Sequence, residues 1–330
     1  MKNIELRQIN HYYGKDQALE NINLTIEEGE FFTLLGPSGC GKTTILRILG
    51  GFISPSSGSI VVSDKDITNL GPEKRNMGTV FQNYALFPNM TVEENVAYGL
   101  KIKKLPKNTI KEKCDFYLEL AGLTDYRKKR VDELSGGQQQ RVAIARALAI
   151  EPTMLLLDEP MSNLDVALRI KMREEIREIQ QKIGITTLFI THDQQEALAI
   201  SDKIAVMDKG RVLQVGTPME VYKNPANDFV ANFVGTSNYI EESQYNNFNI
   251  KNTEKPYIYK RPEEMILVES TDESGFVKVT IESKRFLGPL LEYTVLHNEK
   301  RYNVAMLNRN NNESKLQVGN IAYLGLVQGE

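Results

Sequence analysis

Residues 31–51 read FFTLLGPSGCGKTTILRILGG, and they predict the fold class of the chain. The apolar run at 31–35 is typical of a buried strand, and the spacing of the apolar residues at 43–51 predicts a helix. Between them lies the pattern G-x-x-x-x-G-K-[ST], whose glycines allow backbone N–H groups to turn inward around a phosphate. A strand, a phosphate-binding loop and a helix in this order predict an α/β fold of the P-loop NTPase class.

The loop itself supplies the first candidate ligands for ATP and Mg²⁺. Lys42 is long enough to reach the β- and γ-phosphate oxygens, and the Thr43 hydroxyl is suited to ligate Mg²⁺. Cys40 is interpreted as a small residue that the turn tolerates rather than as a redox sensor. An ordinary glycine-rich turn is the alternative, and the flanking strand and helix argue against it. The residues expected to cradle the phosphates are Gly36, Ser38, Gly39, Cys40, Gly41, Lys42, Thr43 and Thr44.

A second apolar strand, MLLLDE at 154–159, ends in two carboxylates. Because it is apolar throughout, it is predicted to be a central strand of a parallel sheet, and ligands bind at the carboxyl ends of such strands. We expect Asp158 to hold Mg²⁺ through water and Glu159 to orient or deprotonate the attacking water. Acidic residues also commonly begin turns, so the pair alone is weak evidence for a magnesium site. The phosphate loop upstream makes this interpretation strong.

The segment LSGGQ at 134–138 directly precedes a predicted helix. It presents a hydroxyl group and unhindered amides at that helix N-terminus, which makes a second anion site. One nucleotide cannot occupy both sites of one chain if they lie far apart. A head-to-tail pair of chains, in which each segment covers the γ-phosphate bound by the other, resolves this. A simple helix-capping turn is the alternative. The contacts expected from this segment are Ser135, Gly136, Gly137 and Gln138.

Composition sets limits on the partner and the compartment. The 330 residues carry 40 Lys and Arg against 43 Asp and Glu, a net charge of −3, which argues against nucleic acid as a partner. Two cysteines cannot form a disulfide framework and three histidines do not suggest a zinc site, so a reducing cytoplasmic compartment is expected. The chain shows no signal peptide and no run of about 18 apolar residues, so it is not expected to cross a bilayer.

The length predicts two domains. Helical periodicity dominates residues 93–149, and strands alternate with helices from 154 to 208. Residues 237–256 are Asn-rich and polar, which indicates a linker or a surface excursion. Short strands follow. The expected division is therefore an ATPase domain at 1–236, with antiparallel β and helical subdomains, and a small all-β domain at 237–330.

Six motifs stand in one order along residues 1–236: GPSGCGKTT, Gln82 within VFQNYALFP, LSGGQQQR, LLLDEP, SNLD and THD. In this order they resemble the motifs of ABC transporter ATPase subunits. The segment GTPMEVYKNPANDFVANFVG, the KRPEE stretch and the β-rich tail are further similar to the importer ATPases of the maltose, polyamine and ferric-iron type, whose tail is an OB/TOBE-like domain. The one departure is Asn163, where the D-loop usually has alanine.

The resemblance implies roles for further residues. Tyr13 resembles the aromatic residue that stacks on adenine, and Tyr12 is its rival for that role. Gln82 resembles the Q-loop glutamine, which touches Mg²⁺ or the water and reports loss of the γ-phosphate to the membrane partner. Asp165 resembles the D-loop aspartate that links two sites, and His192 resembles the switch histidine that contacts the γ-phosphate. The implied magnesium ligands are Thr43, Gln82 and Asp158, and the implied catalytic residues are Glu159, His192 and Gln82.

The resemblance also implies partners and a location. A homodimer would bind two Mg-ATP at the cytoplasmic face of the membrane and drive a separate integral membrane permease, which an extracytoplasmic substrate-binding protein supplies. Ferric iron is the first expectation for the cargo, polyamine the second, and phosphonate or another small anion the third. A soluble ABC ATPase of translation or DNA maintenance is the alternative, but the chain has one cassette and no heptads. An exporter ATPase is disfavoured by the TOBE-like tail.

Three segments keep two interpretations each. Residues 84–87, YALF, either belong to the core or border the groove that receives a coupling helix of the permease. The basic runs at 101–113 and 127–130 are either patches for nucleic acid or lipid headgroups or solvated surfaces. The net negative charge favours solvated surfaces.

Overall fold

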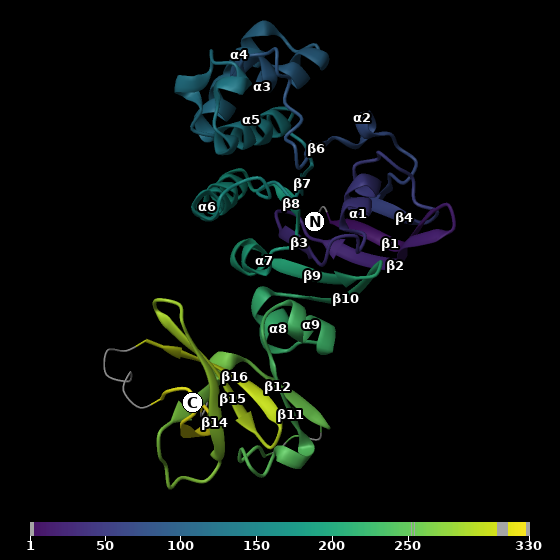
Figure 1. Ribbon diagram of the computed structural model, residues 1–330. Coiled ribbons are helices and arrows are strands. Elements are labelled where there is room, and N and C mark those ends of the chain that lie inside the picture. Colours follow the sequence, from purple (N-terminus) through teal and green to yellow (C-terminus); the bar gives the residue numbers. More distant parts are fainter. Residues whose placement is uncertain (1–2, 252, 254, 309–315, 328–330) are drawn as a thin grey trace. The chain divides into compact units, whose positions relative to one another are not determined.

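The computed structural model describes residues 3–251, 253, 255–308 and 316–327. The chain forms two compact units, Met1–Val221 and Tyr222–Glu330, which are treated separately below. Helix α8 (Pro218–Lys223) spans the division between them (Figure 1).

The first unit is built around a six-stranded sheet in which every neighbouring pair is parallel except the edge pair β10 and β9. Its strands β3 and β8 are buried along their whole length, as expected of apolar runs covered on both faces. The predicted central position of the MLLLDE strand, β7, is confirmed, since β7 lies between β8 and β6. In spatial order the strands are β10 (Arg211–Gly216), β9 (Lys203–Asp208), β3 (Phe31–Leu35), β8 (Thr186–Thr191), β7 (Met154–Asp158) and β6 (Met77–Val80).

A second sheet in this unit is antiparallel and has the order β2-β1-β4-β5. Buried and exposed residues alternate along much of β1 and β2, so the sheet buries one face and solvates the other. The two N-terminal strands were expected from sequence, whereas the short strands β4 to β6 were not. The bounds are β1 (Ile4–Tyr13), β2 (Asp16–Ile26), β4 (Ser57–Val62) and β5 (Lys65–Asp66).

Helices α3, α4 and α5 form a helical subdomain that shares one hydrophobic core with β7 and α6 (Figure 1). No described helix combines the length and apolar composition that a membrane span requires. The helices of the first unit are α1 (Lys42–Leu49), α2 (Pro72–Arg75), α3 (Val92–Ile102), α4 (Lys107–Leu120), α5 (Gly136–Ala149), α6 (Val166–Ile183) and α7 (Gln194–Ile200), with 3₁₀ turns η1 (Thr124–Tyr126) and η2 (Val131–Glu133).

Four of these helices begin at side-chain caps. Thr91 and Ser135 form capping boxes at α3 and α5, in which the hydroxyl accepts a hydrogen bond from the N–H group three residues later. Asp165 caps α6 and Asp193 caps α7 in the same way. Three of the four caps, Ser135, Asp165 and Asp193, lie in the motifs LSGGQ, SNLD and THD. These motifs therefore also determine where their helices start.

The second unit contains a five-stranded antiparallel sheet with the order β13-β17-β14-β15-β16. The sheet curls until β13 and β16 approach each other, which makes a nearly closed barrel and confirms the small all-β fold expected for the tail. A two-stranded sheet of β11 and β12 accompanies it. The bounds are α9 (Asp228–Phe233), β11 (Asn238–Glu241), η3 (Glu242–Gln244), β12 (Tyr257–Lys260), η4 (Pro262–Glu264), β13 (Met265–Val268), β14 (Val277–Phe286), β15 (Leu290–His297), β16 (Lys300–Leu307) and β17 (Ile321–Leu326).

The interpretation of residues 237–256 as a linker or surface excursion is wrong. Strand β11 pairs with β12, and Ile240, Tyr245 and Phe248 are buried in the core of the second unit. The abundant asparagines hid these apolar residues, since only a few buried side chains are needed to anchor a short strand and a turn.

Residues 222–236 also pack with the second unit, so the expected boundary at 236/237 falls within it. Arg261, which is 2% exposed, connects residues 222–236 to the rest of the second unit. Its guanidinium donates to the carbonyl oxygens of Tyr222, Ala231 and Thr236 and to the Ser237 hydroxyl, at 2.6–3.1 Å. A buried guanidinium needs such partners because an unpaired buried charge is costly.

Candidate functional site

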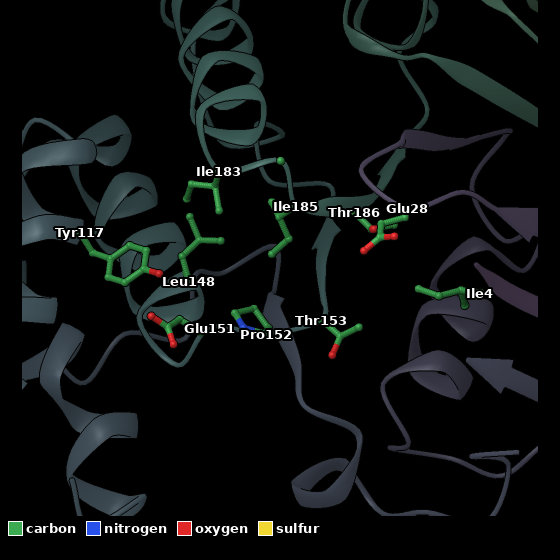
Figure 2. A pocket seen from close by; sticks show the side chains of 11 residues that line it. Ile4, Glu28, Tyr117, Leu148, Glu151, Pro152, Thr153, Ile183, Ile185 and Thr186 are labelled. Atoms are coloured by element: carbon green, nitrogen blue, oxygen red, sulfur yellow. The ribbon is translucent and has the colours of Figure 1, made fainter. Parts of the chain in front are cut away.

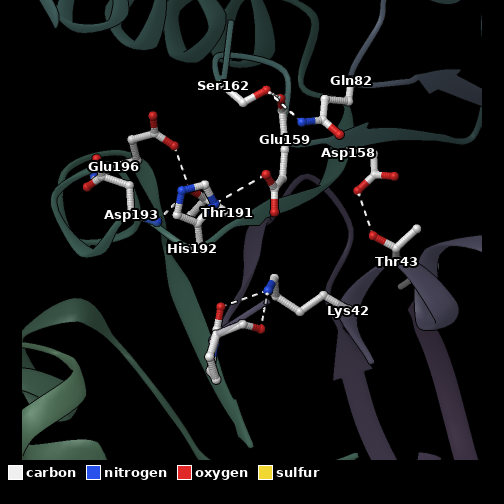
Figure 3. A network of polar contacts seen from close by, with 12 residues as sticks. Lys42, Thr43, Gln82, Asp158, Glu159, Ser162, Thr191, His192, Asp193 and Glu196 are labelled. Carbon is white, nitrogen blue, oxygen red and sulfur yellow. Dashed lines mark hydrogen bonds and ion pairs between the residues drawn. The ribbon is translucent and has the colours of Figure 1, made fainter. Parts of the chain in front are cut away.

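The candidate site lies at the carboxyl ends of the parallel strands, where β3 leads into the phosphate loop and β7 and β8 end (Figure 3). Adjacent strands bring Asp158 and His192 to one edge although they are far apart in sequence. This is the edge at which ligands bind in open α/β sheets.

The phosphate loop needs glycine at two positions for different reasons. Gly41 has φ of 106°, and a Cβ there would lie 2.6 Å from a Leu19 methyl group. Gly36 has no such dihedral, but a Cβ would lie 2.5 Å from the Met207 carbonyl oxygen. Only a residue without a side chain fits either place. The first N–H groups of a helix have no partner within that helix, and an anion site at the start of α1 would use them.

Lys42 folds back onto this loop and is 4% exposed. Its ammonium group donates to the carbonyl oxygens of Gly36 at 2.7 Å and Pro37 at 2.9 Å. These contacts hold the charge inside the loop. Burial raises the pKa of the neighbouring Cys40 thiol and the Lys42 charge opposes that rise, which fits a packed, neutral thiol.

Thr43 and Asp158 meet across the site. The Thr43 hydroxyl donates to a carboxylate oxygen of Asp158 at 3.1 Å (Figure 3). Burial raises the pKa of Asp158, the hydrogen bond from Thr43 opposes this rise, and the nearby charge of Glu159 adds to it. A hydroxyl and a half-buried carboxylate side by side are hard oxygen donors, the type that Mg²⁺ prefers.

Glu159 adopts a left-handed backbone conformation with φ of 44°. Its N–H group donates to the Ile190 carbonyl oxygen at 3.1 Å, which fixes the turn at the end of β7. The carboxylate lies 3.2 Å from Nδ1 of His192. Such a conformation costs a non-glycine residue about 1–3 kcal/mol and is typically retained at functional sites.

A second chain of hydrogen bonds joins Gln82 to the same turn. The Gln82 amide donates to the Ser162 hydroxyl at 3.2 Å, and that hydroxyl donates to the Glu159 carbonyl oxygen at 3.0 Å. Asn163 donates to the Gln82 carbonyl oxygen at 3.1 Å. The residue that departs from the usual D-loop alanine thus binds the Q-loop. Sequence reasoning did not identify Ser162.

Behind His192, a network of hydrogen bonds positions residues 191–193, the segment that contains this histidine. The Thr191 hydroxyl contacts a Glu196 carboxylate oxygen at 2.6 Å and accepts from the Asp193 N–H group at 2.9 Å. Burial raises the pKa of Glu196, and the hydrogen bond with Thr191 opposes this rise. Sequence reasoning missed Glu196 as well; its position four residues after His192, on the first turn of α7, was the available signal.

Tyr13 and Tyr12 are both half-exposed at the end of β1, at 48% and 46%. The Tyr13 ring is held edge-on by His11, with ring centroids 4.7 Å apart, and His11 is buried. No ring contact of Tyr12 was found within the described part of the chain. A supported ring with an exposed face favours Tyr13 over Tyr12 as the base-stacking residue.

Residues 134–138, LSGGQ, are called the signature segment below. This segment lies against Leu164 and α6 rather than against the phosphate loop. Cβ atoms at Gly136 and Gly137 would each lie 3.2 Å from Leu164 and Leu168, respectively, and Ser135 accepts its capping hydrogen bond at 3.4 Å. Gln138 completes the capping box through its side-chain oxygen. Among the described residues, none of the hydrogen bonds of Ser135 or Gln138 reaches the loop at 36–44.

A separate hollow of about 330 Å³ lies at the opposite, amino-terminal edge of β7 and β8 (Figure 2). It contains none of the motif residues, so the chemistry described above does not depend on it. Its lining consists of Ile4, Glu28, Tyr117, Leu148, Glu151, Pro152, Thr153, Ile183, Gly184, Ile185 and Thr186.

Comparison with known proteins agrees with this geometry. Residues 19–162 match the family described as ABC transporter. The Fe(3+) ions import ATP-binding protein FbpC of Fusobacterium nucleatum is 44% identical, over 99% of this chain and 91% of that protein. This chain belongs to the ABC transporter family. The spermidine/putrescine import ATP-binding protein PotA of Clostridium novyi is also 44% identical, over 91% of this chain and 90% of that protein.

Solved structures of ABC transporter ATPases have the same fold. CbiO1 of Clostridium perfringens, part of the ABC transporter complex cbiONQ, has a TM-score of 0.64 and 34% identity, over 68% of this chain and 91% of that one. The dimeric ATP-binding cassette MJ0796, bound to ADP and Pi, has a TM-score of 0.58 and 31% identity, over 65% and 98%. The ABC ATPase fold is therefore confirmed, and ATP hydrolysis coupled to transport is the activity of the family.

Proposed function

We propose that this protein is the ATP-hydrolysing subunit of an importer that works through a separate membrane permease. The observation that carries the proposal is the Glu159–His192 pair, held at the end of β7 beside the phosphate loop. Support also comes from near full-length similarity to the ATP-binding proteins of ferric-iron and polyamine import. Fold alone would not be sufficient, because function depends on the site.

In the proposed mechanism the phosphate loop binds the triphosphate of ATP. Lys42 offsets negative charge on the β- and γ-phosphates, and the Tyr13 ring stacks on the base. Glu159 accepts a proton from the attacking water, and His192 keeps the Glu159 carboxylate oriented and contacts the γ-phosphate. Gln82 senses the γ-phosphate and transmits its loss through Ser162 to the turn that holds Glu159.

The residues present also fit a magnesium ion. The hydroxyl of Thr43, the carboxylate of Asp158 and the amide oxygen of Gln82 are all oxygen donors, and the first two already touch. When bound, Mg²⁺ supplies charge neutralisation of the β- and γ-phosphate oxygens. Asp158 then regains a partner for the carboxylate charge that burial disfavours.

We further propose that two chains pair head to tail. Among the described residues the Ser135 hydroxyl accepts one long hydrogen bond from its own helix and donates none, so its proton is available to a phosphate oxygen bound by the partner. Gly136 and Gly137 supply N–H groups at the start of α5, and Asp165 lies at the neighbouring start of α6. This arrangement completes each nucleotide site with the signature segment of the other chain.

The permease partner has a candidate docking groove on the first unit. It lies along α3 and the segment after the Q-loop, has a volume of about 430 Å³, and is lined by Asn89, Met90, Glu94, Tyr98, Lys101 and Ile102. Tyr84 is buried and belongs to the core, whereas Phe87 packs on Tyr98 of the groove with centroids 4.2 Å apart. A groove of this kind suits an amphipathic helix.

The cargo follows from similarity alone. Ferric iron is placed first because the ferric-iron relative covers 99% of the chain, and polyamine second because those relatives cover 91% or less. A small anion such as phosphonate is third. The ATPase subunit would act at the cytoplasmic face of the membrane as a peripheral partner.

The domains divide these tasks in the proposal. All six nucleotide motifs precede residue 194, so the first unit would bind Mg-ATP, and the second unit would add dimer contacts or a regulatory surface. A chain ended at residue 221, where the first unit ends, should retain calorimetric ATP binding and lose dimer affinity in sedimentation. Loss of ATP binding in a folded fragment would contradict this division.

The decisive experiment is purification of the tagged full-length chain from membranes of its host. An integral membrane protein should copurify, and ATP hydrolysis should rise when substrate-loaded binding protein is added to the reconstituted complex. Copurification with ribosomes or DNA instead would favour a soluble ABC ATPase of translation or DNA maintenance.

A further inference from the structure

The corner between α3 and α4 is a surface that the nucleotide chemistry does not use. Residues 101–111 read KIKKLPKNTIK and contain five lysines and no acidic residue. We call this segment the lysine corner. It belongs to the helical subdomain at the point where α3 ends and α4 begins (Figure 1). All five lysines are exposed, and Ile102 between them is 64% exposed.

Three of these lysines lack a stabilising partner among the residues that the structure describes. Lys104, Lys107 and Lys111 make no ion pair or side-chain hydrogen bond within the described residues. Lys103, by contrast, donates to the Ile150 carbonyl oxygen at 2.7 Å. The charges of the other three are therefore directed at solvent or at something that the chain does not itself supply.

Local structure disfavours lysine at two of these positions. Lys104 has φ of 54°, the left-handed conformation that follows the end of α3 and that normally selects glycine. Lys107 is the first residue of α4, where the helix dipole favours acidic residues, and this helix has no acid in its first turn and no side-chain cap. Residues that violate local preferences without compensation are expected at functional sites.

From this placement we infer that the lysine corner binds the anionic phospholipid headgroups of the membrane that holds the permease. The inference rests on the proposed function, since it needs a membrane partner. The corner is continuous with the proposed docking groove, because Lys101 and Ile102 line both. Whatever occupies the groove in the membrane complex therefore lies directly beside these lysines.

The chemistry of the corner favours lipid over a second protein or nucleic acid. Protein interfaces are enriched in arginine and depleted in lysine, and this segment contains only lysine. Flexible, strongly hydrated ammonium groups around one exposed apolar residue suit a bilayer surface, where each lysine adds to the attraction. Nucleic acid is disfavoured because the segment contains neither arginine nor an aromatic side chain that could stack on bases.

The test measures sedimentation of the full-length protein with vesicles of phosphatidylcholine, with or without phosphatidylglycerol. The test variant is Lys104→Gly with Lys107→Glu. Both changes remove corner charge and also satisfy the local preference at their position, so the thermal midpoint should stay the same or rise. Binding to the anionic vesicles should fall about tenfold or more. A folding defect cannot produce that combination.

The matched control is Lys74→Glu with Lys209→Gly, which changes the net charge equally. Lys209 also has a left-handed φ, of 45°, and Lys74 is exposed on α2. This control should bind anionic vesicles like the wild type, and added salt should weaken all binding. The inference would be overturned if both double variants lost binding equally or if the test variant bound like the wild type. It would also be overturned if wild-type binding did not depend on phosphatidylglycerol.

One outcome separates this inference from the proposed function. If the wild type hydrolyses ATP and copurifies with a permease but shows no preference for anionic vesicles, the lipid inference fails and the proposed function stands. If the test variant loses permease binding in phosphatidylcholine alone, the corner contacts the permease instead, which also overturns the lipid inference.

Discussion

The two units of this chain treat their buried charges differently. In the second unit the Arg261 guanidinium has carbonyl and hydroxyl partners for its donors, so its hydrogen-bonding groups are satisfied within the fold, although burial lowers its pKa. At the nucleotide edge of the first unit, burial raises the pKa of Asp158 and Glu159 occupies a left-handed conformation. A satisfied buried charge is a structural element, whereas uncompensated charge and backbone strain mark a site that awaits a ligand.

The first prediction separates ATP hydrolysis from ATP binding in the first unit. Glu159→Gln should reduce ATP hydrolysis about 1000-fold, because the amide cannot accept the proton of the attacking water. Calorimetric ATP affinity should stay near that of the wild type, and an ATP-bound dimer should accumulate on a sizing column. Glu178→Gln, on the exposed face of α6, is the control. Normal turnover by Glu159→Gln would remove the residue from its assigned role.

The second prediction concerns the phosphate loop. Lys42→Ala should weaken ATP binding about 100-fold, because charge-assisted hydrogen bonds to the phosphates are lost. Calorimetry measures the affinity, with the exposed residue Lys74→Ala as control. Wild-type affinity in the Lys42 variant would show that the loop does not carry the triphosphate.

The third prediction tests the opposite side of the comparison. Arg261→Met should lower the free energy of unfolding of the second unit by about 2–3 kcal/mol, because three carbonyl oxygens lose their buried donor. ATP affinity and turnover should not change. Arg285→Met, which removes an exposed ion pair with Glu292, should cost less than about 1 kcal/mol. If thermal unfolding showed the same loss of stability in both variants, the hydrogen bonds of Arg261 would not stabilise the second unit more than an exposed ion pair does.

The fourth prediction concerns the buried carboxylate of Asp158. Asp158→Asn should raise the thermal midpoint of the nucleotide-free chain slightly, although hydrolysis falls. Burial raises the pKa of Asp158 from 3.8, so this carboxyl is most stabilising when protonated, and stability is lost as pH rises through the raised value.

Asparagine does not titrate, so its advantage should be absent near pH 3.8 and should grow toward neutral pH. Thermal scans across that range measure the difference, with Asp165→Asn as a carboxylate control at an exposed cap. An asparagine variant that is less stable than the wild type at neutral pH would show that Asp158 is already compensated in the free chain.

Sequence predicted the central strands and the site edge well, because both depend on local signals. FFTLL, MLLLD and TTLFIT are continuous apolar runs, and the residues that follow them are chemically distinctive. The short strands β4 to β6 lack such runs and were missed. Arg261 was missed for another reason: a charged residue within KRPEE suggests solvent exposure, and only tertiary contacts show that it is buried.

Within the candidate site, sequence pointed to the residues proposed to bear the chemistry but not to those that connect them. Gln82, Glu159 and His192 have recognisable motifs, whereas Ser162 acts through contacts with residues distant in the chain. The link between Gln82 and Glu159 is therefore a property of the fold. How a second chain completes the site depends on an interface that one chain does not contain.

The capping roles of Ser135, Asp165 and Asp193 affect how mutations in living cells should be interpreted. Replacing any of them by alanine removes a helix cap and costs about 1 kcal/mol of stability. A loss of that size lowers the amount of folded protein that escapes degradation. A transport defect in such a strain therefore includes an effect of reduced abundance, whatever the residue contributes to catalysis. Substitutions that keep the cap, such as Asp165→Asn and Asp193→Asn, would leave the abundance largely unchanged and isolate the chemical contribution.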